Sequence, residues 1–89
     1  MNIEIKKTFT RDTKKIQDKK LLNSILEVIE NLQQASSISD IPNMKKMEGG
    51  NNHYRIRLGD YRLGLFVDDN QTVFIVRFLH RKEIYRYFP

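Results

Sequence analysis

The stretch HYRIRLGDYR, residues 53–62, decides the fold because it reads as two strands joined by a tight turn. Apolar and polar side chains alternate on both sides of Gly59-Asp60, and a period of two places alternate side chains on opposite faces of a sheet. A two-residue connection of this kind is short enough for a β-hairpin. One face of the hairpin is then apolar, and the other carries the basic side chains His53, Arg55, Arg57 and Arg62.

The same alternation continues downstream of the hairpin. Tyr61, Leu63, Leu65 and Val67 share one face of the second strand, and a turn at residues 69–70 follows. Residues 72–79 are apolar on both faces, which is typical of a central strand. The second half of the chain therefore predicts a three-stranded meander.

The first half of the chain supplies one further strand and the helices. Residues 2–8 alternate around Ile3 and Ile5 as a half-buried strand, and Thr10 is placed to cap a helix that begins at Arg11. A longer helix is predicted from Asp18 to Ala35. Its apolar stripe recurs at spacings of three and four residues and consists of Leu22, Ile25, Ile29 and Leu32.

These elements predict an α+β fold in a single domain that spans residues 1–89. We expect a small antiparallel sheet, made of the N-terminal strand and the C-terminal meander. One or two N-terminal helices should pack on that sheet, and the chain should end in a short helical tail. At 89 residues the core is thin, so a bound partner could add much of the stability.

Composition narrows the class of function. The chain has no Cys, which excludes disulfides and thiolate zinc sites, and its two His with dispersed carboxylates make a poor metal cage, so no metal or cofactor is expected. It lacks a long apolar run and a signal-peptide core, so we expect a cytoplasmic protein without a membrane span. Its net charge of +5 favours a polyanionic partner, either a nucleic acid or an acidic protein segment.

Two basic clusters would form one cationic site if the last strand brings them together. The hairpin supplies the first, and residues 77–89 supply the second, with Arg77, His80, Arg81 and Lys82 beside Tyr85. Such a concavity suits the phosphates of RNA. Surface arginines of a solvated hairpin are the plain alternative.

Three segments resemble one known family. They are MKKMEG at 44–49, YRIRLGDYRL at 54–63 and HRKEIY at 80–85, and with the preceding strand and helices the likeness covers nearly the whole chain. The chain resembles the RelE/ParE toxin superfamily of bacterial toxin-antitoxin systems, and within it the RelE-like mRNA interferases. The resemblance implies a metal-independent endoribonuclease that cleaves mRNA in the ribosomal A site. It also implies a monomeric toxin that an acidic, RelB-like antitoxin silences in a larger complex.

The resemblance further implies which residues act. Arg55, Arg57 and Arg62 occupy the basic catalytic positions of the hairpin, and the site is completed by Tyr85 with Arg81 or Lys82. Arginine stands at hairpin positions where ribosome-dependent members often have lysine. Guanidinium groups stay charged and fork onto two phosphate oxygens, so we interpret them as electrostatic clamps.

The proton transfers need other groups. The family comparison favours Tyr85 or Lys82, whereas His80 remains a rival because imidazoles exchange protons near neutral pH. His53 is a further candidate, although a surface position in its strand is the simpler interpretation. Weak proton acceptors would make the ribosome's alignment of the RNA essential.

Two sets of residues are candidates for binding rather than catalysis. RNA or ribosome contacts are predicted for Lys45, Lys46, Arg77 and Arg86, with solvated charge as the plain alternative. Leu21, Leu26 and Val28 widen the apolar stripe of the long helix beyond what a small sheet needs to be covered. We expect this surplus to form a groove for an amphipathic helix of the antitoxin.

Two other functions fit the same fold. A ParE-like toxin would bind and poison DNA gyrase without any nuclease chemistry, and a basic binding module would have no activity. A gyrase-binding protein needs no converging phosphate site. Two basic clusters that meet on one surface would therefore favour the nuclease over the gyrase-binding toxin.

Overall fold

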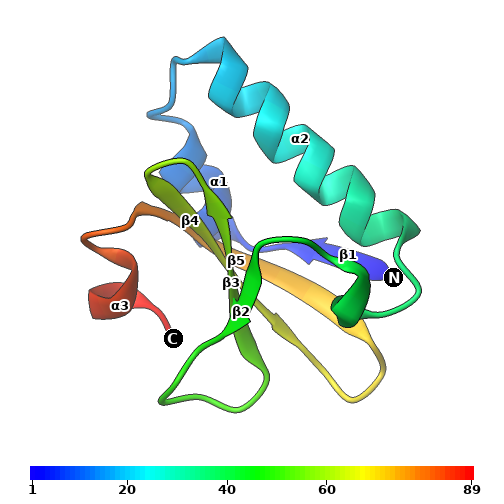
Figure 1. The fold of residues 1–89 in the computed structure, drawn as a ribbon. Coiled ribbons are helices and arrows are strands. Elements are labelled where there is room, and N and C mark those ends of the chain that lie inside the picture. Colours follow the sequence, from blue (N-terminus) through cyan, green and yellow to red (C-terminus); the bar gives the residue numbers. More distant parts are fainter.

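One sheet of five strands organises residues 1–89, all of which the computed structural model describes. The strands lie in the order β1-β5-β4-β3-β2 (Figure 1). In chain order the elements are β1 (Asn2–Ile5), α1 (Lys7–Thr13), α2 (Lys19–Gln34), a 3-10 turn η1 (Ile38–Asp40), β2 (Met44–Lys46), β3 (His53–Leu58), β4 (Tyr61–Val67), β5 (Thr72–His80) and α3 (Ile84–Tyr87). None of the helices is both long enough and apolar enough to cross a membrane.

The expected α+β class is confirmed, including the first strand, the long helix, the meander and the short helical tail. Two details of the sheet differ from the expectation. β1 pairs with β5 in parallel, with Ile3 opposite Val73, so the sheet is mixed rather than antiparallel. A fifth strand, β2, pairs antiparallel with β3 and extends the sheet beyond the hairpin.

The helix boundaries follow from local hydrogen bonding. α1 begins at Lys7, with Lys6 as its N-cap residue, and not at Arg11 after Thr10. β1 accordingly ends at Ile5 rather than at residue 8. α2 begins where expected, because the Asp18 carboxylate accepts from the backbone N–H groups of residues 20 and 21.

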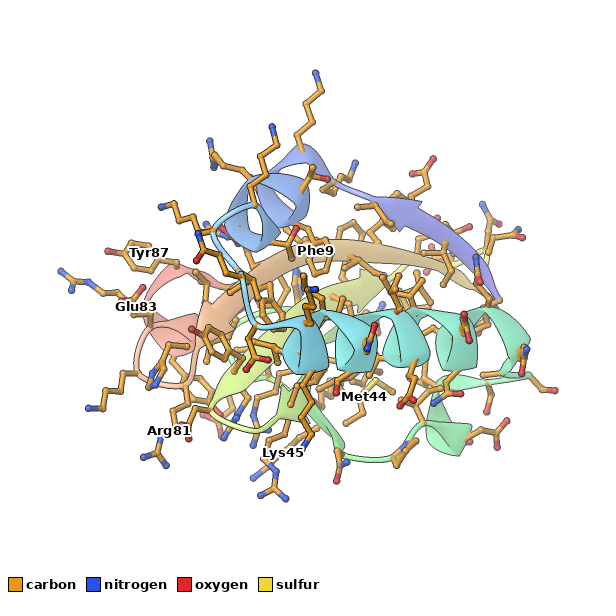
Figure 2. All side chains as sticks on the ribbon, turned by 90° about the horizontal axis from the view of Figure 1, so that it is seen from above. Phe9, Met44, Lys45, Arg81, Glu83 and Tyr87 are labelled. Atoms are coloured by element: carbon orange, nitrogen blue, oxygen red, sulfur yellow. The ribbon has the colours of Figure 1, made fainter.

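The main core lies between the sheet and the helices α1 and α2. On the sheet side, Leu63, Leu65 and Ile75 have no exposed surface. α2 contributes Ile25 and Leu32, and these are its buried residues. Phe9 of α1 meets the sheet edge-on, as Figure 2 shows between α1 and β5, with 6.1 Å between its ring centroid and that of Phe78.

A β-bulge in β5 changes which side chains face the helices. Gly64 pairs with Arg77 and Leu65 pairs with Ile75, so Val76 is an extra residue without a partner on β4. Before the bulge the odd-numbered residues of β5 face α1 and α2, and after it the even-numbered residues Phe78 and His80 do so. The bulge also turns Val76 toward a second, smaller core.

α1 covers the edge of β5 where the shorter β1 has ended. The Thr8 hydroxyl donates to the carbonyl of Val76, and the backbone N–H of Phe78 donates to the Asp12 carboxylate over 3.0 Å. These two bonds take the place of bonds that a longer β1 would make and so cover part of the exposed edge of β5.

The opposite face of the sheet carries only the C-terminal tail. α3 lies on this open face, away from α2 (Figure 1). Its contact is the second core, which consists of Met47, Ile84 and Phe88 packed against Val76 and Leu79. The part of the open face over the hairpin is left for basic side chains, whereas Phe66 and Phe74 stack on each other at its other end.

Candidate functional site

The basic side chains of the hairpin lie together on the open face. In the sheet register Lys45 is opposite Arg55, and Arg57 is opposite Arg62, so β2, β3 and β4 each contribute to one group. We call Lys45, Arg55, Arg57 and Arg62 the arginine cluster. These residues, together with Asn43 and Met44, line a shallow hollow of about 400 Å³.

Arg62 occupies the most crowded position in the arginine cluster. Its Nη1 donates to the carbonyls of Gly59 and Tyr61, over 2.8 and 2.9 Å, which fixes the guanidinium over the hairpin turn. Its Nε is buried and has no hydrogen-bond partner. Burial lowers the pKa of Arg62, and the charges of Arg55, Arg57 and Arg81 lower it further, whereas Tyr85 acts in the opposite direction.

The lowered pKa means that the charge of Arg62 is costly in the folded protein, first because it is partly withdrawn from water and then because neighbouring cations repel it. A guanidinium stays protonated at neutral pH, so the cost of holding the charge is fully present there and is relieved only above the strongly alkaline folded-state pKa. No carboxylate forms an ion pair with Arg55, Arg57 or Arg62. An anion bound in the hollow would remove this repulsion.

The tail brings Tyr85 to the same face. The ring centroid of Tyr85 is 6.0 Å from Cζ of Arg55, and 63% of Tyr85 is exposed. The middle of the chain and its last residues therefore meet on one surface, which is the convergence that the nuclease interpretation required.

Arg81 and Lys82 lie where the tail leaves the sheet. The backbone N–H of Arg81 donates to the carbonyl of Asp60 over 2.7 Å, and its Nε is 3.9 Å from Asp60 Oδ1. The Arg81 side chain is 58% exposed and projects outward from the loop before α3 (Figure 2). Lys82 is also exposed. These two cations are at the rim of the site rather than within the hollow.

Neither histidine contacts the arginine cluster. His80 is opposite Tyr61 in the register, on the helix-covered face, and its Nδ1 accepts the backbone N–H of Lys82. The bulge at Val76 puts it there. His53 lies on the open face but packs between Phe66 and Phe88, with centroid distances of 5.5 and 5.4 Å.

Of the residues predicted to contact RNA, only Lys45 lines the hollow. Lys46 is the neighbour of Lys45 in a strand and is directed to the other face. Arg77 pairs with Asp12, with its Nε 2.8 Å from Oδ2 and its Nη2 3.2 Å from Oδ1. Arg86 lies over the ring of Tyr87 at 5.6 Å.

The three residues predicted for the antitoxin divide into two groups. Leu21 and Val28 line a groove of about 510 Å³ between α2 and the β3–β4 hairpin, which Leu58 and Tyr61 also line. Leu26 is 58% exposed and lies outside this groove.

Two residues of the site were missed in the sequence. Asn43 lines both the hollow and the groove, and its φ of 63° is tolerated better by asparagine than by most residues. The only signal for it was its position in a polar connector. Gly64 lies beneath the tail, and an isolated glycine inside a strand pattern is a recognised sign of close approach.

Known proteins match the chain over most of its length. The family model described as ParE toxin of type II toxin-antitoxin system, parDE, matches residues 3–85. Toxin RelE3 of Methanocaldococcus jannaschii is 40% identical over 90 aligned positions that span all of both chains.

Solved structures agree with this assignment. In the RelB-RelE antitoxin-toxin complex from Methanococcus jannaschii, one chain is 39% identical with a TM-score of 0.79, covering 96% of this chain and 98% of that one. A chain of the archaeal RelE-RelB complex from Pyrococcus horikoshii OT3 shares the fold at 23% identity, with a TM-score of 0.72 and coverage of 90% and 93%. The chain therefore belongs to the RelE/ParE superfamily of toxins from type II toxin-antitoxin systems.

Proposed function

We propose that the protein is an endoribonuclease that cleaves mRNA on the ribosome and so stops translation. The observation that carries the proposal is the meeting of Arg55, Arg57 and Arg62 with Tyr85 on one exposed face. The full-length similarity to a RelE toxin supports the same activity.

The reaction uses the ribose of the substrate as its nucleophile. The 2′-hydroxyl attacks the adjacent phosphorus, the bond to the 5′-oxygen breaks, and the products carry a 2′,3′-cyclic phosphate and a 5′-hydroxyl. Negative charge builds up on the non-bridging oxygens, where guanidinium donors are most effective. In this proposal Arg55 and Arg57 hold those oxygens, and the guanidinium of Arg62, which also lines the hollow, adds positive charge beside them.

Tyr85 is our candidate for the group that takes the proton of the 2′-hydroxyl. Its phenol is exposed beside the arginine cluster, with its ring next to Arg55. The two histidines fit this task poorly, because His80 faces α1 and α2 and His53 is enclosed by aromatic rings. Lys82, at the rim, is assigned to donate the proton that the leaving 5′-oxygen needs, and Arg81 is assigned to RNA contact.

Dependence on the ribosome follows from the shape of the site. The hollow of about 400 Å³ is lined by cations and offers no enclosed pocket that would orient a base. Positioning of the 2′-hydroxyl against the phosphorus must then come from outside, and alignment of this kind contributes about 7 kcal/mol or more to catalysis. We infer that the free protein cleaves naked RNA slowly.

Silencing by an antitoxin completes the proposal. The solved relatives from both archaea are complexes of RelE with RelB. We propose that this chain binds a RelB-like, acidic partner that uses the groove beside Leu21 and Val28. Leu26, which lies outside that groove, is exposed on α2 and would contact another part of the same partner.

Mapping of mRNA 5′ ends after induced expression tests the nuclease. We expect new ends within codons in the ribosomal A site, lost in Arg62→Ala and Tyr85→Phe but retained in Arg11→Ala. Arg11 is an exposed arginine of α1, so its removal changes net charge without touching the site. Growth arrest with intact mRNA would contradict the proposal, and accompanying double-strand DNA breaks would favour gyrase, as the ParE description of the family model allows.

A further inference from the structure

The tail is attached to the open face on both sides of Tyr85. At its start, the backbone of Arg81 is bonded to Asp60 at the hairpin tip. At its end, Phe88 is only 4% exposed. The helix between these points has four residues, which is too short to be stable without tertiary contacts. The two attachments therefore set the direction of Tyr85.

Phe88 can reach the sheet only because β4 has a glycine beneath it. A Cβ built on Gly64 would be 2.7 Å from Cδ2 of Phe88, closer than an unstrained carbon contact. Gly64 is not among the residues with positive φ, so its backbone conformation does not require glycine. Close approach of the Phe88 ring is the remaining reason for glycine at this position.

In the sheet register, Gly64 lies between two basic residues on the neighbouring strands. Gly64 is opposite Arg55 on one side and Arg77 on the other. The ring of Tyr85 lies 6.0 Å from Arg55, and the ring of Tyr87 lies 6.0 Å from Arg77. A rotation of α3 would break both contacts at once.

The other residues of the second core hold α3 at a fixed distance from the sheet. Ile84 has no exposed surface and packs with Met47 and Phe88 against Val76 and Leu79. Val76 is available there because the bulge in β5 makes it an extra residue. This small core therefore orients the tail as well as stabilising it.

We propose that Gly64 and Phe88 are positioning residues of the ribonuclease site. The ring of Phe88 packs directly against the backbone of Gly64, and this contact holds α3 so that the phenol of Tyr85 stays beside Arg55. This inference rests on the proposed nuclease function, in which Tyr85 takes the proton.

Gly64→Ala is the direct test, with single-turnover cleavage of mRNA in programmed ribosomes as the readout. The added methyl group displaces Phe88, and we expect the cleavage rate to fall by about 10²-fold, as for a misplacement of roughly 1 Å in a catalytic group. The affinity for the ribosome should not change, because the arginine cluster is untouched. Wild-type cleavage by Gly64→Ala would overturn the proposal.

Three further variants separate positioning from stability. Phe88→Ala removes the anchor from the tail side and should lose the same activity even if Gly64→Ala does not fold. Gly64→Ala/Phe88→Leu makes room for the methyl group and should recover much of the rate. Val67→Ala, in the same strand but in the main core, should lower the melting temperature without lowering the cleavage rate of the folded protein.

A fluorine label on Tyr85 distinguishes failure of this inference from failure of the nuclease proposal. The ¹⁹F signal of 3-fluorotyrosine at position 85 should shift in Arg55→Ala, and it should move to a solvent-like value in Gly64→Ala and Phe88→Ala. If the wild type cleaves no RNA but the signal behaves in this way, only the nuclease proposal fails. If the signal is unchanged in Gly64→Ala and Phe88→Ala, the positioning role is wrong.

Discussion

The two faces of the sheet use the same strands in opposite ways. On the helix-covered face Leu63, Leu65 and Ile75 are fully buried, whereas their neighbours on the open face include Arg62 and Gly64. The first face is closed by α1 and α2, and the second is covered only in part, by the tail. Successive residues of one strand therefore point to different faces, one that stabilises the fold and one that carries the proposed site.

Charge compensation also differs between the sheet's edge and its open face. At the edge Arg77 is bonded to Asp12, and this pair joins α1 to β5. In the arginine cluster, by contrast, Arg55, Arg57 and Arg62 repel one another without an acidic partner. Clustered like charges lower stability, and an anion bound among them would offset that cost.

The largest effect is expected on the helix-covered face. Leu63→Ala should lower the free energy of unfolding by about 2–5 kcal/mol, because it leaves a cavity among fully buried residues. Urea unfolding measures this loss. Cleavage by the fraction that remains folded should be unaffected, and a selective loss of cleavage would show that the two faces are not independent.

Arg55→Ala should slow cleavage and leave stability nearly unchanged, which is the converse of Leu63→Ala. Its neighbours are cations and Tyr85, so we expect about 10²-fold slower cleavage, or roughly 2.7 kcal/mol in the barrier. Urea unfolding should show no comparable loss of stability. Arg11→Ala is the matched control, and equal activities for the two variants would remove Arg55 from the site.

Asp12→Ala should break the junction between α1 and β5. The carboxylate accepts from Arg77 and from the backbone of Phe78, so its loss should cost about 1.5–3 kcal/mol of stability, as for hydrogen bonds to charged groups. Thermal and urea unfolding would report it. Unchanged stability would mean that this contact contributes little.

The smallest effect concerns the repulsion in the arginine cluster. Sulfate bound in the hollow among these unpaired cations should stabilise the native state, by about 1.4 kcal/mol at ten times its dissociation constant. The gain should be smaller in Arg57→Gln, measured by thermal shift at constant ionic strength. Equal gains in the two proteins would place the anion elsewhere.

Periodicity predicted most of the fold, since it records which side chains are buried. Alternation over residues 53–67 located both faces of the hairpin, and the spacing of Leu22, Ile25 and Ile29 located α2. The parallel pairing of β1 was not predictable, because alternation does not specify the direction of a neighbouring strand. The three residues of β2 are too few to show a period.

The positions of the candidate site residues were predictable only in strands that keep a regular alternation of side chains. Arg55, Arg57 and Arg62 lie on the expected face because the hairpin is regular. His80 lies on the other face because the bulge at Val76 shifts the phase of β5, and no residue of β5 itself signals a bulge; the one sign is Gly64 on the paired strand. The pairing of Arg77 with Asp12 joins residues 65 positions apart, which local patterns do not record.

A double-mutant cycle tests most directly whether the hairpin and the tail form one site. The measured quantity is the single-turnover cleavage rate in programmed ribosomes for wild type, Arg55→Ala, Tyr85→Phe and the double variant. If the two groups act on the same phosphate, the double variant should be little slower than the slower single variant. Fully multiplicative losses would contradict a shared site.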